Sequence, residues 1–324
     1  MYNQTQLKDL VEKALLNLSL PCEAPRLAET IRYILSAGGK RLRPVLALMA
    51  CNIFTDKIDH AVLPAAGLEI FHNFTLVHDD IMDNAPVRRN LPTVHTRWNV
   101  NQAILSGDIM AFIATECFIN LPPEILQTVL RIYNKAAIDV CTGQQLDLDY
   151  EKVPSVTESE YLRMIELKTA SLIAASLAIG ATLGGAGTKE RDTLHEFGVN
   201  LGMAFQIQDD LLDVYGETRI FGKTSGGDIA AGKKTFLYIK AMEMATGELL
   251  KTLKSLYLDK NNNRAEKIII VKEIYDTLNI PQITENLANQ YISRAISTLK
   301  SLPVNNDRKE ELMSLALSLT GRNI

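Results

Sequence analysis

The chain has 324 residues, of which 47% are hydrophobic and 22% charged, and its formal net charge is −4. This composition is typical of an ordinary globular protein with a large apolar core, built as one big domain or two average ones. The slightly acidic balance and the absence of a separate basic block give no support to nucleic-acid binding.

The cysteines and the most apolar segment indicate a reduced, non-membrane environment. Cys22, Cys51, Cys117 and Cys141 are widely spaced and form no CxxC pair, so we expect free thiols in the cytoplasm and no zinc site. The first residues lack the basic-then-apolar pattern of a signal peptide. Residues 169–187 are apolar but rich in Ala, Gly, Ser and Thr, which favours a buried bundle helix over stable membrane insertion.

Apolar residues recur at helical spacing from the start of the chain, as at Leu7, Leu10, Val11 and Leu15, and no segment alternates like a strand. Turn-forming clusters separate the helical segments at residues 38–39, 84–92, 121–123, 184–187, 222–227, 259–263 and 303–307. They divide the chain into about ten to twelve helices. None of the turns is a flexible linker. We therefore expect one all-α domain over residues 1–324, a large helix bundle whose central helices line an apolar cavity.

Two aspartate triplets of identical spacing are the most informative motif, each preceded by an apolar helical segment. The triplets are Asp79, Asp80 and Asp83, and Asp209, Asp210 and Asp213. On a helix this spacing gathers three carboxylates within an arc of roughly 100°, where like charges repel unless a cation lies among them. Carboxylate oxygens suit Mg²⁺, which is commonly completed by substrate phosphates. The two triplets thus predict several Mg²⁺ ions that clamp a diphosphate.

Basic residues lie near each triplet in the sequence and would neutralise the rest of such a diphosphate. Arg and Lys side chains beside a glycine turn are well suited to phosphate oxygens. The basic segments are Gly38-Gly39-Lys40-Arg41-Leu42-Arg43-Pro44, Arg88-Arg89, Lys168-Thr169, Gly222-Lys223-Thr224 and Lys233-Lys234.

These motifs together resemble the trans-polyprenyl (isoprenyl) diphosphate synthase family over residues 40–234. The resemblance rests on both DDxxD motifs, the Gly-Gly-Lys-Arg-Leu-Arg-Pro segment, Arg88-Arg89 with Pro92-Thr93 and His95, Gly143-Gln144 with Asp147, Lys168-Thr169, and Phe205-Gln206-Ile207-Gln208. It implies an all-α enzyme, usually a homodimer, that condenses isopentenyl diphosphate with an allylic diphosphate. Asn90 is a departure, since the family commonly has Gly there.

The resemblance also implies roles for individual residues. Asp79, Asp83 and Asp209 would be the principal ligands of roughly three Mg²⁺ ions, with Asp80, Asp210 and Asp213 supporting them or binding through water. Arg88, Lys168, Thr169, Gln206 and Lys223 would bind the allylic diphosphate, and Lys233 would reach it. Lys40, Arg43, His72 and Arg89 would bind isopentenyl diphosphate. The catalytic set would be Asp79, Asp83, Arg88, Lys168, Asp209 and Lys223, while Lys234 has no assigned role.

Product length is expected to depend on residues just before the first triplet. Phe74 and Thr75 precede Asp79 by five and four residues, and in this family a bulky residue there closes the pocket for the growing chain. Phe71 is the alternative floor. Phe74, without a two-residue insertion in the first triplet, resembles short-chain enzymes, with geranylgeranyl diphosphate the first choice of product and farnesyl diphosphate the second.

Other functions remain open. A terpene cyclase would ionise the same substrates, but Arg89 and the segment of residues 40–43 would then have no second diphosphate to bind. A non-catalytic subunit of a heteromeric synthase typically lacks some of the aspartates that this chain retains. A calcium-binding protein of the EF-hand type would need a ligand spacing and a central glycine that neither triplet has.

Overall fold

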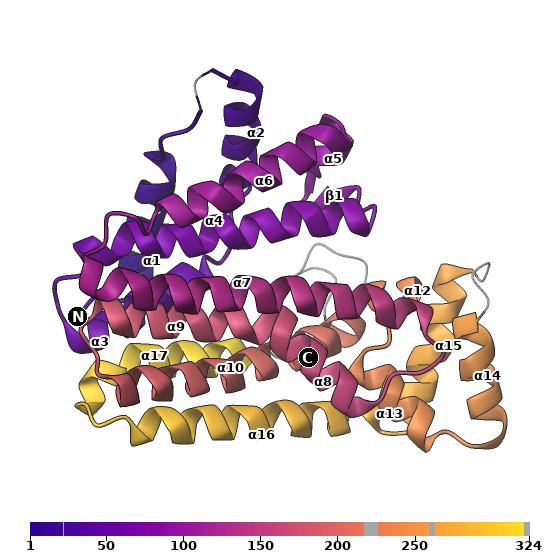
Figure 1. Ribbon diagram of the computed structural model, residues 1–324. Helices are drawn as coiled ribbons and strands as arrows, with labels where there is room; N and C mark the ends of the chain where they lie inside the picture. The colour runs from indigo at the N-terminus through magenta and orange to yellow at the C-terminus, as the bar shows by residue number, and fades with distance from the viewer. Residues whose placement is uncertain (22, 217–225, 259–262, 321–324) are drawn as a thin grey trace. The chain divides into compact units, whose positions relative to one another are not determined.

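The computed structural model describes residues 1–21, 23–216, 226–258 and 263–320, and it is almost entirely α-helical (Figure 1). The chain divides into two compact units, which are described separately. Unit 1 comprises Met1–Asn134, Ala175–His195 and Leu302–Leu312, and unit 2 comprises Lys135–Ala174, Glu196–Ser301 and Met313–Ile324. The all-α prediction is confirmed. The expectation of one domain over residues 1–324 stays a prediction.

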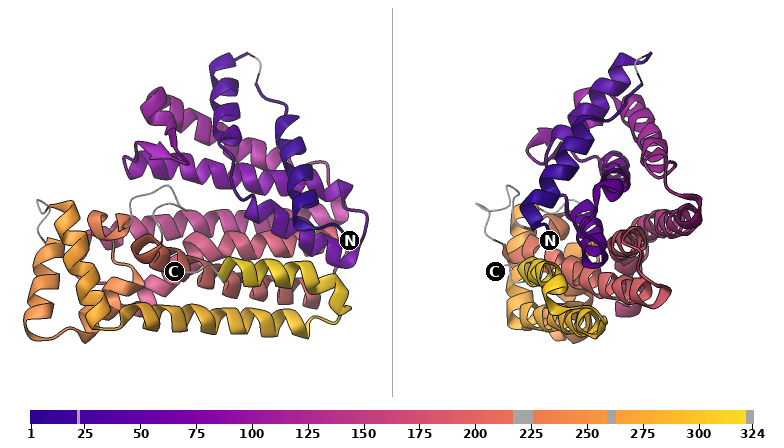
Figure 2. Two further views of the ribbon diagram at one scale, coloured as in Figure 1. Left: turned by 180° about the vertical axis from the view of Figure 1, so that it is seen from behind. Right: turned by 90° about the vertical axis from the view of Figure 1, so that its left-hand side faces the viewer.

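Unit 1 contains the N-terminal helices, a short hairpin and the first aspartate triplet. The elements that lie entirely within it are α1 (Gln4–Leu16), α2 (Pro25–Ser36), α3 (Leu42–Phe54), α4 (Asp59–Met82), β1 (Val87–Arg88), β2 (Leu91–Pro92), α5 (Val94–Arg97) and α6 (Val100–Glu116). Helix α4 packs against α3 and α6, and α1 covers both α3 and α4. Two views show α4 and α6 side by side (Figure 2).

Unit 2 contains the second triplet and a core of its own. The elements that contribute to it are α7 (Pro123–Lys152), α8 (Glu158–Ile165), the π-helix η1 (Glu166–Ala170), α9 (Ser171–Leu183), α10 (Thr188–Tyr215), α12 (Gly227–Ala231), α13 (Phe236–Met244), α14 (Gly247–Leu258), α15 (Arg264–Thr277), α16 (Ile280–Ser301) and α17 (Asn306–Thr320). Phe236, Leu253 and Tyr275 are almost fully buried in that core. Burial of such large apolar side chains is the main force that stabilises the unit.

One continuous helical segment, Glu158–Leu183, is long and apolar enough to cross a membrane, and 83% of its most apolar window is buried inside the protein. The small residues of α9 let neighbouring backbones approach closely. An added Cβ at Gly180, for example, would lie 1.9 Å from the carbonyl oxygen of Ala47. The helix is therefore packed inside protein, as its small-residue composition predicts.

Two local features differ from the sequence expectation. The described residues contain more helical segments than ten to twelve, because short pieces such as α5, α12 and η1 leave no periodic pattern to detect. A two-stranded antiparallel hairpin pairs Val87 with Pro92 and Arg88 with Leu91, in a stretch expected to be a turn.

Candidate functional site

The turn before α3 is held by a buried arginine. Gly38, Gly39 and Arg41 all have positive φ, at 75°, 142° and 50°, and a non-glycine residue needs support there. The Arg41 guanidinium supplies it, because Nε lies 2.8 Å from Glu12 Oε1, and Nη1 lies 2.9 Å from Glu69 Oε1. Arg41 is thus a structural residue, and the neighbouring Lys40 carries the exposed positive charge.

Arg89 lies on this glycine turn. Its Nη1 donates to the carbonyl oxygen of Gly38, and a Cβ built on Gly39 would lie 3.1 Å from the guanidinium. A side chain at residue 39 would therefore push Arg89 aside. The pair of glycines predicted to form a phosphate-binding turn also makes room for a cation from the hairpin.

Arg89 and Asn90 form the two-residue turn of the hairpin, with φ of 52° and 63°. Such a turn needs positive φ at both central residues, and Asn is among the residues that adopt it most readily. The replacement of the family's usual Gly by Asn90 is therefore compatible with the local backbone.

The hairpin is fixed to α2 by a hydrogen bond from an aromatic cluster in which two rings meet edge to face. Tyr33 Oη donates to the carbonyl oxygen of Pro92 at 2.6 Å, and its ring centroid lies 5.1 Å from that of Trp98. The guanidinium of Arg97 lies over both rings, 4.3 Å from the Tyr33 centroid and 4.7 Å from the Trp98 centroid. Cation–π contacts of this kind hold a loop in place at a partly exposed site.

The three aspartates of the first triplet have different surroundings. Asp80 is 5% exposed, and its Oδ1 accepts a hydrogen bond from Arg88 Nε at 2.7 Å. Burial raises the pKa of Asp80, although the Arg88 charge acts in the opposite direction. Asp79 is half-buried and Asp83 is exposed at the C-cap of α4. Asp79 and Asp83 therefore remain the better candidates for metal ligands, and Asp80 holds Arg88.

Arg43 adds a further cation to unit 1 near the imidazole of His72, and Lys40 is exposed. Burial, followed by the charges of Arg43, Arg89 and Arg88, keeps the pKa of His72 well below its usual value, so its imidazole is neutral near pH 7. Burial also lowers the pKa of Arg43, to about 10. The buried Nε of Arg43 has no hydrogen-bond partner among the described residues, and an anionic ligand would satisfy this donor.

The expected floor residues belong to an aromatic series below the triplet. The ring centroid of Phe74 lies 5.4 Å from that of Phe71 and 4.9 Å from that of His78, and Phe71 in turn packs on Tyr133. Thr75 Oγ1 donates to the carbonyl oxygen of His72 at 2.8 Å. Phe71 is 3% exposed, whereas Phe74 is only partly buried, which makes Phe74 the more accessible of the two rings.

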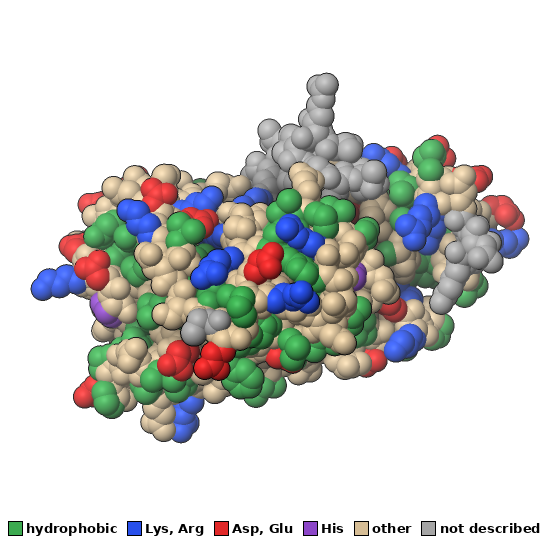
Figure 3. Space-filling view, turned by 90° about the horizontal axis from the view of Figure 1, so that it is seen from above, with side chains coloured by type: hydrophobic (Ala, Val, Ile, Leu, Met, Phe, Trp, Pro, Cys, Tyr) green, Lys and Arg blue, Asp and Glu red, His purple; other side chains and the backbone are tan. Residues whose placement is uncertain are grey.

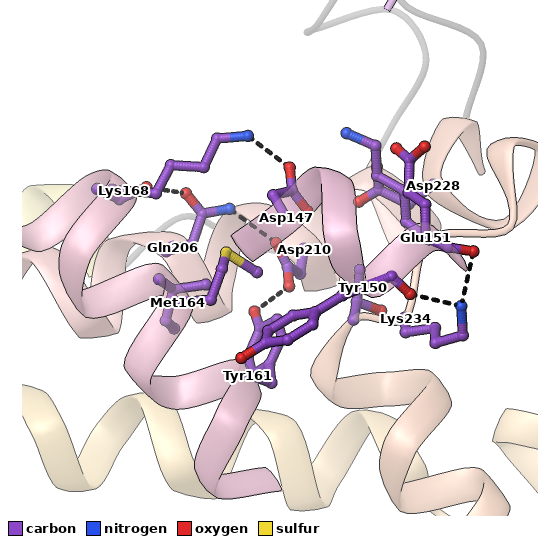
Figure 4. Close-up of a pocket in the computed structure, with 14 residues that line it drawn as sticks. Asp147, Tyr150, Glu151, Tyr161, Met164, Lys168, Gln206, Asp210, Asp228 and Lys234 are labelled. Carbon is purple, nitrogen blue, oxygen red and sulfur yellow. Dashed lines mark hydrogen bonds and ion pairs between the residues drawn. The ribbon is translucent and has the colours of Figure 1, made fainter. Parts of the chain in front are cut away.

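Unit 2 contains a cavity of about 90 Å³, drawn in Figure 4. Its polar lining includes Asp147, Lys168, Thr169, Gln206, Asp210 and Lys233. Lys168 Nζ points toward Asp147 and lies 2.6 Å from its Oδ2. The cavity thus brings together four predicted allylic-diphosphate residues, Lys168, Thr169, Gln206 and Lys233, while Lys223 lies outside the described residues.

A π-turn presents Lys168 and Thr169. Element η1 interrupts the α-helix at Glu166–Ala170, and single π-turns of this kind occur frequently at functional sites. Two glycines allow neighbouring helices to contact it. A Cβ on Gly143 of α7 would lie 2.4 Å from Lys168 N, and one on Gly202 of α10 would lie 2.5 Å from Ala170 Cα. The backbone around Lys168 is thus enclosed on two sides.

Four side chains of the cavity form a continuous hydrogen-bonded series. Thr169 Oγ1 donates to Gln206 Oε1 at 2.8 Å, Gln206 Nε2 donates to Asp210 Oδ1 at 2.8 Å, and Tyr161 Oη donates to Asp210 Oδ2. Burial, together with the Asp228 charge, raises the pKa of Asp210 well above its usual range, while the two donated hydrogen bonds act against this rise. Sequence reasoning missed Tyr161, which no motif marks.

The remaining predicted residues of unit 2 lie at helix ends or on the surface. Asp209 is exposed, and Asp213 Oδ2 accepts from the backbone N–H of Asp228 at 2.9 Å, at the start of α12. Lys234 Nζ donates to the carbonyl oxygens of Tyr150 at 2.7 Å and Glu151 at 3.3 Å. Lys234, left without a role by the sequence, therefore caps the C-terminal end of α7.

These carboxylates suit a metal that is completed by substrate. Within the described parts of the chain, no three His, Cys, Asp or Glu side chains form a ready-made ion cage. Mg²⁺ commonly takes one or two carboxylates and fills its other positions with water and phosphate oxygens. Asp79, Asp83 and Asp209 fit that requirement, because their carboxylates are less buried than those of Asp80 and Asp210.

On the face drawn in Figure 3, outside the grey atoms, Lys and Arg side chains are interspersed with Asp and Glu and do not form one basic area. A broad field of one sign would be needed to steer a large polyanion. The part of this face outside the grey atoms therefore presents no such field.

Comparison with known proteins identifies the family. Residues 24–278 match the family model described as polyprenyl synthetase. The chain belongs to the polyprenyl synthetase family. A geranylgeranyl diphosphate synthase of Sulfolobus acidocaldarius is 36% identical over 293 residues, 88% of this chain and 87% of the relative. A geranylfarnesyl diphosphate synthase of Aeropyrum pernix is 34% identical over 300 residues, 90% of this chain and 92% of the relative.

Solved structures of this family share the fold. A crystal structure of a geranylgeranyl pyrophosphate synthase matches with a TM-score of 0.95 and 36% identity, and the match covers 100% of both chains. Another geranylgeranyl pyrophosphate synthase, from Corynebacterium glutamicum, was solved in complex with isoprenyl diphosphate and magnesium. It matches with a TM-score of 0.86 and 25% identity over 99% of this chain and 97% of that chain. The chain therefore has the isoprenyl synthase fold.

Proposed function

We propose that this prenyltransferase joins isopentenyl diphosphate to an allylic diphosphate with Mg²⁺, releasing diphosphate and yielding geranylgeranyl diphosphate. The observation that carries the proposal is that each unit has an aspartate triplet beside its own group of cations. In unit 1, Asp80 is paired with Arg88, and in unit 2, Asp210 and Lys168 line one cavity. Two acidic motifs and two cationic groups match a reaction that uses two diphosphate substrates.

The unit 1 group is proposed to bind isopentenyl diphosphate. Arg43 offers a buried donor that has no partner in the part of the chain that the structure describes, and Arg89 lies on the glycine turn next to the exposed Lys40. The neutral imidazole of His72 can donate one hydrogen bond without adding charge. These residues would hold the diphosphate while the alkene end of the substrate attacks the allylic carbon.

The unit 2 cavity is proposed to bind the allylic diphosphate through Lys168, Thr169, Gln206 and Lys233. The family resemblance assigns Arg88 and Lys223 to the same substrate from the sequence alone. Lys168 would exchange Asp147 for a diphosphate oxygen and stabilise negative charge on the departing group. The resemblance to the family implies about three Mg²⁺ ions, with Asp79, Asp83 and Asp209 as principal ligands and support from the other aspartates, which would neutralise diphosphate charge. No side chain is assigned as a dedicated base, so the final proton would pass to a diphosphate oxygen.

The product assignment rests on Phe74. Its partly buried ring lies one turn before Asp79 on α4 and closes the path of a growing chain in this proposal. Geranylgeranyl diphosphate is favoured, with farnesyl diphosphate as the shorter alternative.

A homodimer in the cytoplasm is the proposed state of the enzyme. Helix α6 exposes Ile104, Leu105 and Phe112, and the Phe112 side chain is 76% exposed. Large apolar side chains gathered on one helix favour a protein contact over solvent. Sedimentation of the purified chain tests this state independently of activity.

One experiment tests the reaction. The chain is incubated with isopentenyl diphosphate, Mg²⁺ and each allylic primer in turn, and the dephosphorylated products are separated by chromatography. Elongated all-trans prenols that require both substrates are expected. Hydrocarbon formed from the allylic diphosphate alone would instead indicate a terpene cyclase, and no turnover with any primer would contradict the proposed reaction.

A further inference from the structure

The Gln206 side chain has its orientation fixed from both ends. The NH₂ end of the Gln206 amide faces Asp210, and its Nε2 donates to Asp210 Oδ1 at 2.8 Å. The opposite end, Oε1, accepts from the Thr169 hydroxyl at 2.8 Å. One of the two Nε2 hydrogens is used on Asp210, and the other is left for a ligand in the cavity that Gln206 lines.

Asp210 is fixed in turn by Tyr161. This tyrosine is 1% exposed, and its hydroxyl donates to the second carboxylate oxygen of Asp210. With Oδ1 facing Gln206 and Oδ2 facing Tyr161, both oxygens are engaged within the protein, and the side chain is 5% exposed. Figure 4 shows Tyr161 below Asp210, on the side away from Gln206.

We propose that Tyr161 is a positioning residue for the allylic substrate: through Asp210 it holds the Gln206 amide so that a free N–H is directed to the diphosphate. The inference rests on the proposed function. It also makes two expected roles more specific. Thr169 uses its one hydroxyl proton on Gln206 and therefore positions that residue, and Asp210 supports Gln206 and does not bind Mg²⁺ directly.

The test is Tyr161→Phe, which removes one oxygen and leaves the buried ring. The apparent KM for the allylic diphosphate should rise roughly tenfold, as expected for loss of a hydrogen bond to a charged group. The KM for isopentenyl diphosphate and the Mg²⁺ concentration for half-maximal activity should stay unchanged. Tyr275→Phe is the matched control, because Tyr275 is equally buried in unit 2 and its hydroxyl lies 3.2 Å from that of Tyr257, away from the cavity lining.

A double-mutant cycle with Gln206→Ala shows whether Tyr161 acts through Gln206. In the Gln206→Ala background, Tyr161→Phe should no longer change the allylic KM. An unchanged allylic KM in Tyr161→Phe, a change shared by both substrates, or full additivity in the cycle would overturn the proposal. If Tyr161→Phe does not fold, Thr169→Val releases the other end of the amide and enters the same cycle. A wild-type chain that consumes no isopentenyl diphosphate would instead refute the proposed reaction.

Discussion

Asp80 and Arg88 form an ion pair in unit 1, with 2.7 Å between Oδ1 and Nε, in which the aspartate side chain is 7% exposed and the arginine side chain 34%. Asp210 of unit 2 is also turned inward, toward Tyr161 and Gln206. The middle aspartate of each triplet therefore holds a neighbouring side chain, while the outer ones are more accessible.

Because the middle and outer aspartates have different contacts, substitutions at Asp79 and Asp80 should affect activity and stability differently. Asp79→Ala should lower turnover about 10²–10³-fold and raise the Mg²⁺ requirement, because charge stabilisation is lost while a repelling cluster is relieved. Asp80→Asn should leave the Mg²⁺ requirement near that of the wild type but lower the free energy of unfolding by about 1–3 kcal/mol, since Arg88 loses its carboxylate. Steady-state kinetics over a Mg²⁺ series and urea unfolding measure both. Asp192→Ala, at an exposed position, is the control, and equal Mg²⁺ responses in the two variants would contradict the assignment.

The two adjacent glycines of the basic turn form a second contrast. Both have positive φ, so Ala at either position strains the backbone, but only a Cβ on Gly39 meets Arg89, since nothing lies within 4 Å of one on Gly38. Gly39→Ala should therefore raise the KM for isopentenyl diphosphate more than Gly38→Ala does, at a comparable loss of stability. Identical kinetics would show that Arg89 does not depend on this contact.

Substitutions in the two cationic groups should separate the substrates. Arg43→Ala should chiefly raise the KM for isopentenyl diphosphate, whereas Lys168→Ala should chiefly raise that for the allylic diphosphate. Initial rates with one substrate varied and the other saturating give the two constants. If each variant raised the KM of both substrates equally, the assignment of residues to substrates would be wrong, although the reaction class would stand.

His72 predicts a pH dependence of stability. Its folded-state pKa lies well below 6.5, so between the two values the unfolded chain binds more protons. The free energy of unfolding should therefore fall as the pH drops below about 6.5, by up to about 1.4 kcal/mol per pH unit from this group. Asp80 and Asp210, whose pKa values are raised, contribute with the opposite sign. The difference between wild type and His72→Gln in metal-free urea unfolding isolates the histidine, and parallel pH profiles would refute its contribution.

The chain length of the product tests whether Phe74 closes the pocket for the growing chain. Phe74→Ala opens apolar volume that would cost about 3–5 kcal/mol if it stayed empty, while a longer prenyl tail would recover roughly 0.8 kcal/mol per buried CH₂. The products should lengthen by one or more isoprene units with turnover largely retained. Phe71→Ala is the comparison. Chromatography that gives the original chain length for a folded, active Phe74→Ala, and longer products for Phe71→Ala, would move the floor to Phe71.

The sequence predicted the elements better than the side-chain directions. Periodicity and turn residues predict the all-α fold, and the adjacent glycines Gly38 and Gly39 predict the turn before α3. Identical DDxxD spacing could not reveal that Asp80 and Asp210 face inward, because that depends on Arg88 and Tyr161. The π-turn at Glu166–Ala170 shifts the helical register without a sequence signal, so the relation between Tyr161 and Lys168 could not be inferred from their spacing. The sequence likewise could not show which of the adjacent lysines, Lys233 or Lys234, contacts the C-terminal end of α7. In the structure it is Lys234.

The aromatic cluster beside the hairpin gives the protein an intrinsic fluorescence signal close to its cationic residues. Trp98 is the chain's one tryptophan, and Tyr33 contacts its indole while hydrogen-bonding Pro92 at the base of the hairpin. We expect that a shift of Arg88 or Arg89 toward an anion is passed along the hairpin to Pro92 and Tyr33, and so alters the surroundings of that indole. Titration of the unlabelled, unaltered chain with inorganic diphosphate should therefore change the Trp98 emission, and this change reports binding separately from turnover.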